Sequence, residues 1–125
     1  MNQQPGPVIV DIAGTSLTPE DRERLAHPLV GGVILFSRNF ESADQVARLT
    51  ADMRTARDGA LLVCVDHEGG RVQRFRDGFS AIEPMRALGQ RWDVDPVDAC
   101  REATSIGATI GRELKAVGVD LSFTP

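Results

Sequence analysis

The residues best suited to chemistry form one dense segment, Asp66-His-Glu-Gly-Gly-Arg-Val-Gln-Arg-Phe-Arg76, directly after an apolar run. The segment holds two carboxylates and three arginines around a double glycine. A fixed carboxylate can accept hydrogen bonds from neighbouring sugar hydroxyls, and an arginine fork donates directed hydrogen bonds to oxygens of a sugar or an anion. Glycines let a backbone approach a ligand closely. This composition indicates a site for a polyol or an anion, and the alternative is an exposed loop stabilised by its own arginine–carboxylate pairs.

Asp66 and Glu68 could in principle be the two carboxylates of a glycoside hydrolase. Such pairs are separated by about 5–5.5 Å in retaining enzymes and about 6.5–9.5 Å in inverting ones, which residues two apart can reach in a bent loop. The two groups must also flank the scissile bond, and a single short turn rarely allows that. We therefore do not expect these two residues to be the catalytic pair.

The composition excludes several classes of protein. The chain has 125 residues, about one domain. Its 18 acidic residues outnumber its 14 basic ones, giving a net charge of -4, so we expect no nucleic-acid partner. No signal-peptide pattern and no apolar run of about 18 residues occurs, which predicts a soluble, cytoplasmic protein with no membrane partner. Cys64 and Cys100 have neither metal nor redox spacing, and we interpret both as buried free thiols.

Short apolar runs alternate along the chain with helices whose first turns carry capping residues. Thr18, Ser42 and Asp95 are N-cap candidates for helices over 19–25, from about 43, and from 96 to an end at Gly118. Ser42 and Gln45 also have the spacing of a capping box. The apolar runs predict four strands, at residues 7–13, 31–36, 60–65 and 121–125, of which the first three read as buried.

Strands that alternate with helices predict a parallel sheet, in either a doubly wound fold or a (β/α)8 barrel. Polar residues follow successive strands, Arg38 and Asn39 after the second and Asp66 after the third, which favours the barrel. Because a barrel takes about 250 residues, we expect residues 1–125 to be the N-terminal half of a TIM barrel, a partial domain truncated after its fourth strand. Arg38 and Asn39 should brace neighbouring loops, and the aperiodic stretch 67–93 should be irregular and anchored to the barrel by Trp92.

Three blocks of this sequence together resemble the bacterial β-N-acetylhexosaminidases of glycoside hydrolase family 3. They are Gly31-Gly-Val-Ile-Leu-Phe-Ser-Arg-Asn39, the segment from Asp66 to Arg76 with Gly78-Phe79 after it, and Gly118-Val-Asp-Leu-Ser-Phe-Thr-Pro125. The blocks occur in the family's order and cover nearly the whole chain. The resemblance implies a single barrel that removes terminal N-acetylglucosamine from peptidoglycan fragments (muropeptides) during cell-wall recycling, by a retaining reaction without metal or other cofactor.

The resemblance also implies roles for individual residues. Asp66 would hold sugar hydroxyls in the subsite for the terminal residue, and Arg74 would assist it. Glu68 and Arg71 are expected to order the loop. His67 stands where the family is expected to have glutamine, and we interpret it as a tolerated exchange, because an imidazole can both donate and accept as an amide does.

The family's catalytic groups, a His–Asp acid/base pair and a nucleophilic aspartate, come later in the family pattern than the block that ends at Pro125. The resemblance therefore implies no catalytic residue among these 125 and an inactive, poorly folded chain when isolated. The alternative is a non-catalytic carbohydrate-binding or interaction module on the same half-barrel. The sequence leaves the oligomeric state open.

Overall fold

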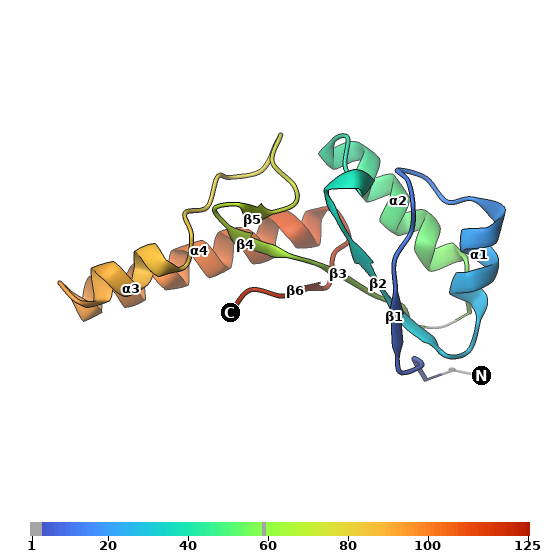
Figure 1. Ribbon diagram of the computed structural model, residues 1–125, viewed down its shortest axis with the longest axis horizontal. Helices are drawn as coiled ribbons and strands as arrows, with labels where there is room; N and C mark the ends of the chain where they lie inside the picture. The colour runs from blue at the N-terminus through green and yellow to red at the C-terminus, as the bar shows by residue number, and fades with distance from the viewer. Residues whose placement is uncertain (1–3, 59) are drawn as a thin grey trace.

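The protein is described by a computed structural model that covers residues 4–58 and 60–125. Its centre is a parallel four-stranded sheet, drawn with its helices in Figure 1. The strands lie in the order β1 (Val8–Val10), β2 (Val30–Leu35), β3 (Leu62–Val65) and β6 (Leu121–Ser122). Each strand therefore pairs with the preceding strand of this sheet, as in the successive strands of a barrel, which confirms the predicted α/β class.

Three of the helices in the described ranges begin where the sequence predicts, and one lies within residues 67–93, which were expected to be irregular. They are α1 (Pro19–Ala26), α2 (Ala43–Thr55), the short α3 (Arg86–Trp92) and α4 (Pro96–Ala116). Thr18, Ser42 and Asp95 each accept a hydrogen bond from a backbone N–H of the first turn. The capping box of α2 is only half formed, because the side-chain carbonyl of Gln45 accepts from the N–H of Glu41, at 2.8 Å, instead of that of Ser42. None of the helices in the described ranges is long and apolar enough to cross a bilayer.

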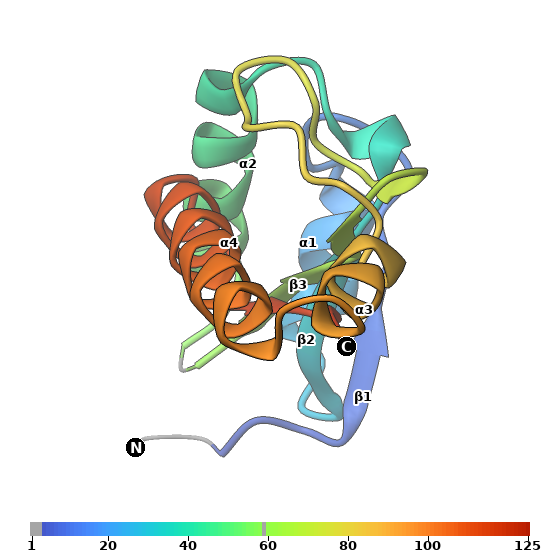
Figure 2. The same cartoon turned by 90° about the vertical axis from the view of Figure 1, so that its left-hand side faces the viewer.

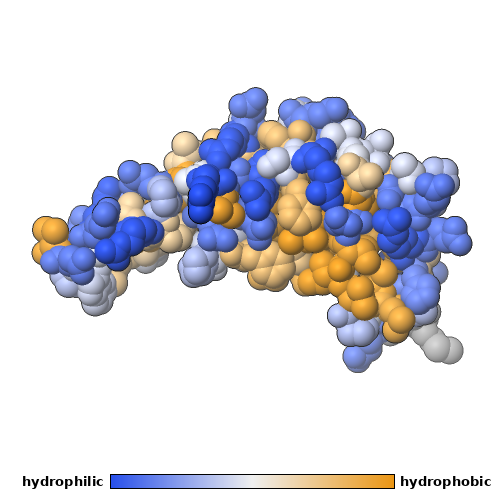
Figure 3. Space-filling model, viewed as in Figure 1, coloured by the Kyte–Doolittle hydropathy of each residue, from blue (hydrophilic) through white to orange (hydrophobic). Residues whose placement is uncertain are grey.

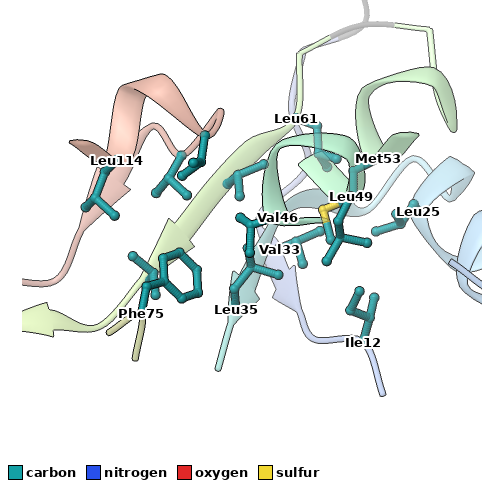
Figure 4. Packing of buried hydrophobic residues seen from close by; sticks show 14 of the residues in the cluster. Ile12, Leu25, Val33, Leu35, Val46, Leu49, Met53, Leu61, Phe75 and Leu114 are labelled. Atoms are coloured by element: carbon teal, nitrogen blue, oxygen red, sulfur yellow. The ribbon is translucent and has the colours of Figure 1, made fainter. Parts of the chain in front are cut away.

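The hydrophobic core lies between the sheet and the helices. Alternate strand residues such as Val33, Leu35 and Val63 are fully buried against one side of the sheet, and α2 and α4 lie on that same side (Figure 2). Figure 4 shows the packing, with Leu49 and Met53 of α2 close to the β2 side chains. This layer fixes the carboxyl ends of the strands, where the predicted site residues lie.

The opposite face of the sheet is largely open. Ile9 pairs in register with Gly32, which pairs with Leu62, so that these positions share a face, and Ile9 and Leu62 are exposed. Figure 3 shows apolar surface over this part of the molecule. The expectation of a buried first strand is therefore wrong: Val8 and Ile9 of β1 are 42% and 44% exposed. Ile9 lies on the face of this edge strand that none of the helices in the described ranges covers, and Val8, on the other face, borders an open pocket beside α1.

The segment 67–93 is more regular than predicted. It contains a two-stranded antiparallel ribbon, β4 (His67–Gly69) with β5 (Val72–Gln73), followed by α3. The expectation that Trp92 anchors this segment is wrong, because its side chain is 54% exposed and α3 packs along α4. Of the two cysteines, Cys64 is buried as predicted, whereas Cys100 is exposed on α4.

Gly118 ends α4 in a conformation that a side chain would strain. Its φ is +80°, and a Cβ built there would lie 2.3 Å from Oγ1 of Thr50, which donates to the carbonyl of Val117 at 2.8 Å. We expect Gly118→Ala to lower the free energy of unfolding by about 2–3 kcal/mol through left-handed strain and loss of this hydrogen bond. Chemical denaturation of the variant and of the unsubstituted protein measures this difference in the free energy of unfolding. Gly107→Ala on α4, where a Cβ meets nothing within 4 Å, is the control and should not destabilise; equal losses in both variants would contradict the prediction.

Candidate functional site

The predicted pair, Asp66 and Arg74, is brought together by the short ribbon. Asp66 directly follows β3 and Arg74 directly follows β5, and the ribbon pairs His67 with Gln73. The two neighbouring residues therefore lie opposite each other. The N–H of Arg74 donates to the carbonyl of Asp66 at 3.3 Å, and its Nη2 donates to Oδ2 of Asp66 at 3.2 Å.

The pair is partly open to solvent and keeps hydrogen-bonding capacity. The side chains of Asp66 and Arg74 are 24% and 28% exposed. Their contact uses a single carboxylate oxygen, and Nε of Arg74 is buried with no hydrogen-bond partner among the described residues. A carboxylate has about four lone-pair sites and a guanidinium five N–H donors, so the pair can bind an adjacent hydroxyl-rich ligand without first separating. No group of three or more metal-ligating side chains occurs in residues 4–58 and 60–125.

The loop after Asp66 is ordered by residues other than those the resemblance suggested. Neither Glu68 nor Arg71 forms a side-chain hydrogen bond or ion pair within the part of the chain that the structure describes. Arg76 instead donates to the carbonyl of Gly70 at 2.6 Å, and the buried amide of Gln73 forms three hydrogen bonds. Sequence reasoning missed Gln73, because a single amide has no distinctive spacing in the sequence.

The double glycine makes room for another part of the protein's own backbone. Gly69 has a φ of +96°, and a Cβ there would lie 2.4 Å from the carbonyl oxygen of Glu83. The N–H of Gly70 donates to the carbonyl of Ile82 at 2.7 Å. In this structure the close approach expected for a ligand is made by residues 82–84, which fold over the turn of the ribbon.

Arg38 and Asn39 brace neighbouring loops, as predicted. They lie in η1 (Ser37–Asn39), just after β2. The buried side chain of Asn39 donates to the carbonyls of Ile12 and Gly14, at 3.1 and 2.8 Å, and accepts from the N–H of Phe36. Arg38 also donates to the carbonyl of Ile12 at 3.2 Å. Both residues thus hold the loop after β1 against the loop after β2.

His67 does not act as a substitute for an amide in this structure. Its ring is fully buried, and neither nitrogen has a hydrogen-bond partner among the described residues. The ring lies among aromatic side chains, with centroids 5.7 Å from Phe79 and 6.1 Å from Phe75. Burial lowers the pKa of the imidazole, an effect that the charge of Arg76 adds to and that of Glu113 opposes. His67 is therefore a neutral packing residue.

The lowered pKa of His67 predicts a pH-dependent stability. Below about pH 6.5, the ordinary pKa of histidine, the unfolded chain binds a proton that the folded chain excludes. Stability is therefore complete above that pH and falls as the pH drops towards the folded-state pKa, by at most about 1.4 kcal/mol per pH unit. Denaturation at pH 7 and pH 5.5 measures the loss. It should shrink in His67→Gln and persist in a variant of the exposed His27, His27→Gln; an undiminished loss in His67→Gln would refute the prediction.

Comparisons with known proteins cover nearly the whole chain. The family model described as "Glycosyl hydrolase family 3 N terminal domain" matches residues 8–125. A protein of Chromobacterium violaceum named "Beta-hexosaminidase" is 57% identical over 125 residues, which are 100% of this chain and 35% of that protein. One of the same name from Bordetella avium is 59% identical over 97% of this chain and 35% of its own length.

A solved structure is similar in fold as well. It is described as NagZ from Neisseria gonorrhoeae in complex with N-trifluoroacetyl-D-glucosamine, and it superposes with a TM-score of 0.95 at 47% identity. The match covers 99% of this chain and 36% of that one. The chain thus spans about a third of the length of the curated relatives it matches.

Proposed function

This chain belongs to glycosyl hydrolase family 3, and from that membership we propose that it supplies part of the substrate-binding site of a β-N-acetylhexosaminidase. The identity of 57–59% to proteins named β-hexosaminidase supports the activity. Because the chain spans only about a third of those relatives, the activity proposed is that of a protein with their full length. The single observation that carries the proposal is the contact between Asp66 and Arg74, each about a quarter exposed, at the carboxyl end of β3.

The substrate proposed is a terminal β-linked N-acetylglucosamine. Asp66 would accept hydrogen bonds from neighbouring sugar hydroxyls, and Arg74 would orient the carboxylate and donate to a sugar oxygen. The related NagZ was crystallised with a glucosamine derivative, which supports a sugar of this class. We place the reaction in the cytoplasm, on muropeptides of cell-wall recycling, with retention of configuration and without a metal.

The catalytic groups would come from the portion of the relatives' length that these 125 residues do not match. Asp66 and Arg74 bind and orient, and they transfer no proton to the scissile bond in this scheme. We therefore propose that residues 1–125 alone are inactive. Release of 4-nitrophenol from its β-N-acetylglucosaminide by the purified chain would contradict this point.

A chimera tests the function directly. Residues 1–125 would replace the matching 35% of the Chromobacterium violaceum β-hexosaminidase, and 4-nitrophenol release would be measured. We expect a kcat/KM within about tenfold of the parent enzyme, since each misplaced hydrogen bond costs about 0.5–1.5 kcal/mol. A folded chimera that binds N-acetylglucosamine without hydrolysing it would favour a non-catalytic carbohydrate-binding module, and one that does neither would overturn the proposal.

A further inference from the structure

The buried amide of Gln73 joins both ends of the loop that follows β5. Its Nε2 donates to the carbonyls of Phe75 and Ser80, both at 3.0 Å, and its Oε1 accepts from the N–H of Ile82 at 3.1 Å. Both hydrogens of the amide and its oxygen are thus used. The loop closes on a single side chain, and that side chain is adjacent to Arg74 in the sequence.

Ser80 connects this loop to α4. The Glu113 carboxylate of α4 accepts from the N–H of Ser80, at 3.0 and 3.2 Å, and from its hydroxyl at 2.6 Å. The carbonyl of Ser80 accepts from Gln73. Every polar group of Ser80 therefore takes part in a continuous chain of contacts from α4 to Gln73.

Arg74, which follows Gln73 directly in the sequence, has few side-chain contacts of its own. Arg74 has one side-chain hydrogen bond, to Asp66, while its Nε is unpartnered within the described ranges. A long side chain with so few bonds loses its position easily, because many rotamers compete with the observed one. Gln73 and Phe75, on either side of it, are both buried and fix the backbone from which it extends.

We propose that Gln73 is a positioning residue for Arg74, and that Glu113 couples the position of α4 to the same arginine through Ser80. The consequence for sugar affinity rests on the proposed function. The consequence for the order of Arg74 does not. An experiment with both readouts can therefore distinguish failure of this inference from failure of the proposed function.

The experiment uses the chimera described above, labelled with ¹⁵N, because residues 1–125 are expected to be poorly folded when isolated. Four variants probe the contacts: Gln73→Met removes the amide, Glu113→Ala removes the carboxylate, Glu113→Gln keeps an acceptor for Ser80, and Glu102→Ala is the control. Glu102 is also an acid of α4, but its ion-pair partner is Arg91 of α3, and no side-chain hydrogen bond among the described residues joins either of them to Ser80 or Gln73. The readouts are the Nε–H signal of Arg74, hydrogen exchange at the Ile82 amide, and a ¹⁹F titration with N-trifluoroacetyl-D-glucosamine.

We expect faster Nε–H exchange and a more mobile Arg74 signal in Gln73→Met and Glu113→Ala, with near-normal behaviour in Glu113→Gln and Glu102→Ala. The sugar affinity should fall about 3- to 10-fold in Glu113→Ala and about 10- to 100-fold in Gln73→Met, given the usual net strength of one and of several hydrogen bonds. Because Ser80 and Glu113 lie at an exposed contact, Glu113→Ala should fold normally even where Gln73→Met does not.

Each possible result bears on a different part of the proposal. An Arg74 signal unchanged in Glu113→Ala overturns the coupling to α4, and one unchanged in a folded Gln73→Met overturns the role of Gln73. A loosened Arg74 with unaltered sugar affinity overturns the functional part of the inference. If the unsubstituted chimera binds no sugar while Arg74 loosens as expected in the variants, the positioning role is supported and the proposed sugar-binding role fails alone.

Discussion

Asp66→Ala lowers kcat/KM of the chimera by about 10²- to 10⁴-fold, the largest effect on activity that we expect from any single substitution. Two lost hydrogen bonds from sugar hydroxyls to a charged acceptor cost about 1.5–3 kcal/mol each, and each 1.4 kcal/mol is a factor of ten. The change also leaves Arg74 without the carboxylate that it contacts at 3.2 Å. Initial rates of 4-nitrophenol release measure the loss.

A matched control separates the site from general loss of charge. Asp52 of α2 is an exposed carboxylate, 3.9 Å from its arginine partner Arg22. Exposed pairs of this kind contribute little to stability, so Asp52→Ala should leave kcat/KM unchanged. If Asp66→Ala hydrolyses the substrate as fast as Asp52→Ala does, Asp66 does not belong to the sugar site.

Phe75→Ala should lower the free energy of unfolding by about 3–5 kcal/mol, the usual cost of removing a buried phenylalanine. The ring is fully buried, stacks on Phe40 with centroids 5.1 Å apart, and lies 5.5 Å from Phe79 (Figure 4 shows its place beside the sheet). Domains are stable by only about 5–15 kcal/mol in total, so this one change removes a large share. Urea denaturation followed by circular dichroism measures it.

The control for Phe75 is another phenylalanine of the same chain. Phe123, just after β6, is exposed, and Phe123→Ala should change the stability by less than about 1 kcal/mol. A loss below about 1 kcal/mol in Phe75→Ala as well would show that the aromatic cluster does not stabilise the loop. Arg74 precedes Phe75 directly, so a destabilised cluster should also loosen the proposed sugar site.

Local signals in the sequence were enough to place most of the helices and strands. The start of α1 follows from Thr18 and Pro19, and the end of α4 follows from Gly118, because capping and left-handed backbone depend on residues within one turn. Burial was harder. Trp92 and Cys100 were assigned to the interior by residue type, whereas their exposure depends on which distant element packs beside them.

In the candidate site, too, local sequence signals predicted some features, and tertiary packing determined the others. Asp66 and Arg74 were proposed because a strand end and a family pattern mark them, and the ribbon brings their side chains into contact, while their role in sugar binding stays a prediction. Gln73 was missed because an amide has no distinctive spacing, and its three partners are set by the fold of the loop. His67 was misread for a related reason: the sequence shows an imidazole, but the aromatic side chains around it come from elsewhere in the loop.

The order β1, β2, β3, β6 also bears on how the chain folds during synthesis. Each strand of this sheet pairs with the strand of the same sheet that was translated before it, so the ribosome releases these strands in the order in which the sheet grows. The ribbon that carries Asp66 and Arg74 emerges between β3 and β6. The last contact of this ribbon to form is the hydrogen bond that the hydroxyl of Thr124 donates to the carbonyl of His67, at 3.1 Å. The contact between the ribbon and the end of this segment therefore forms only after Thr124 has left the exit tunnel.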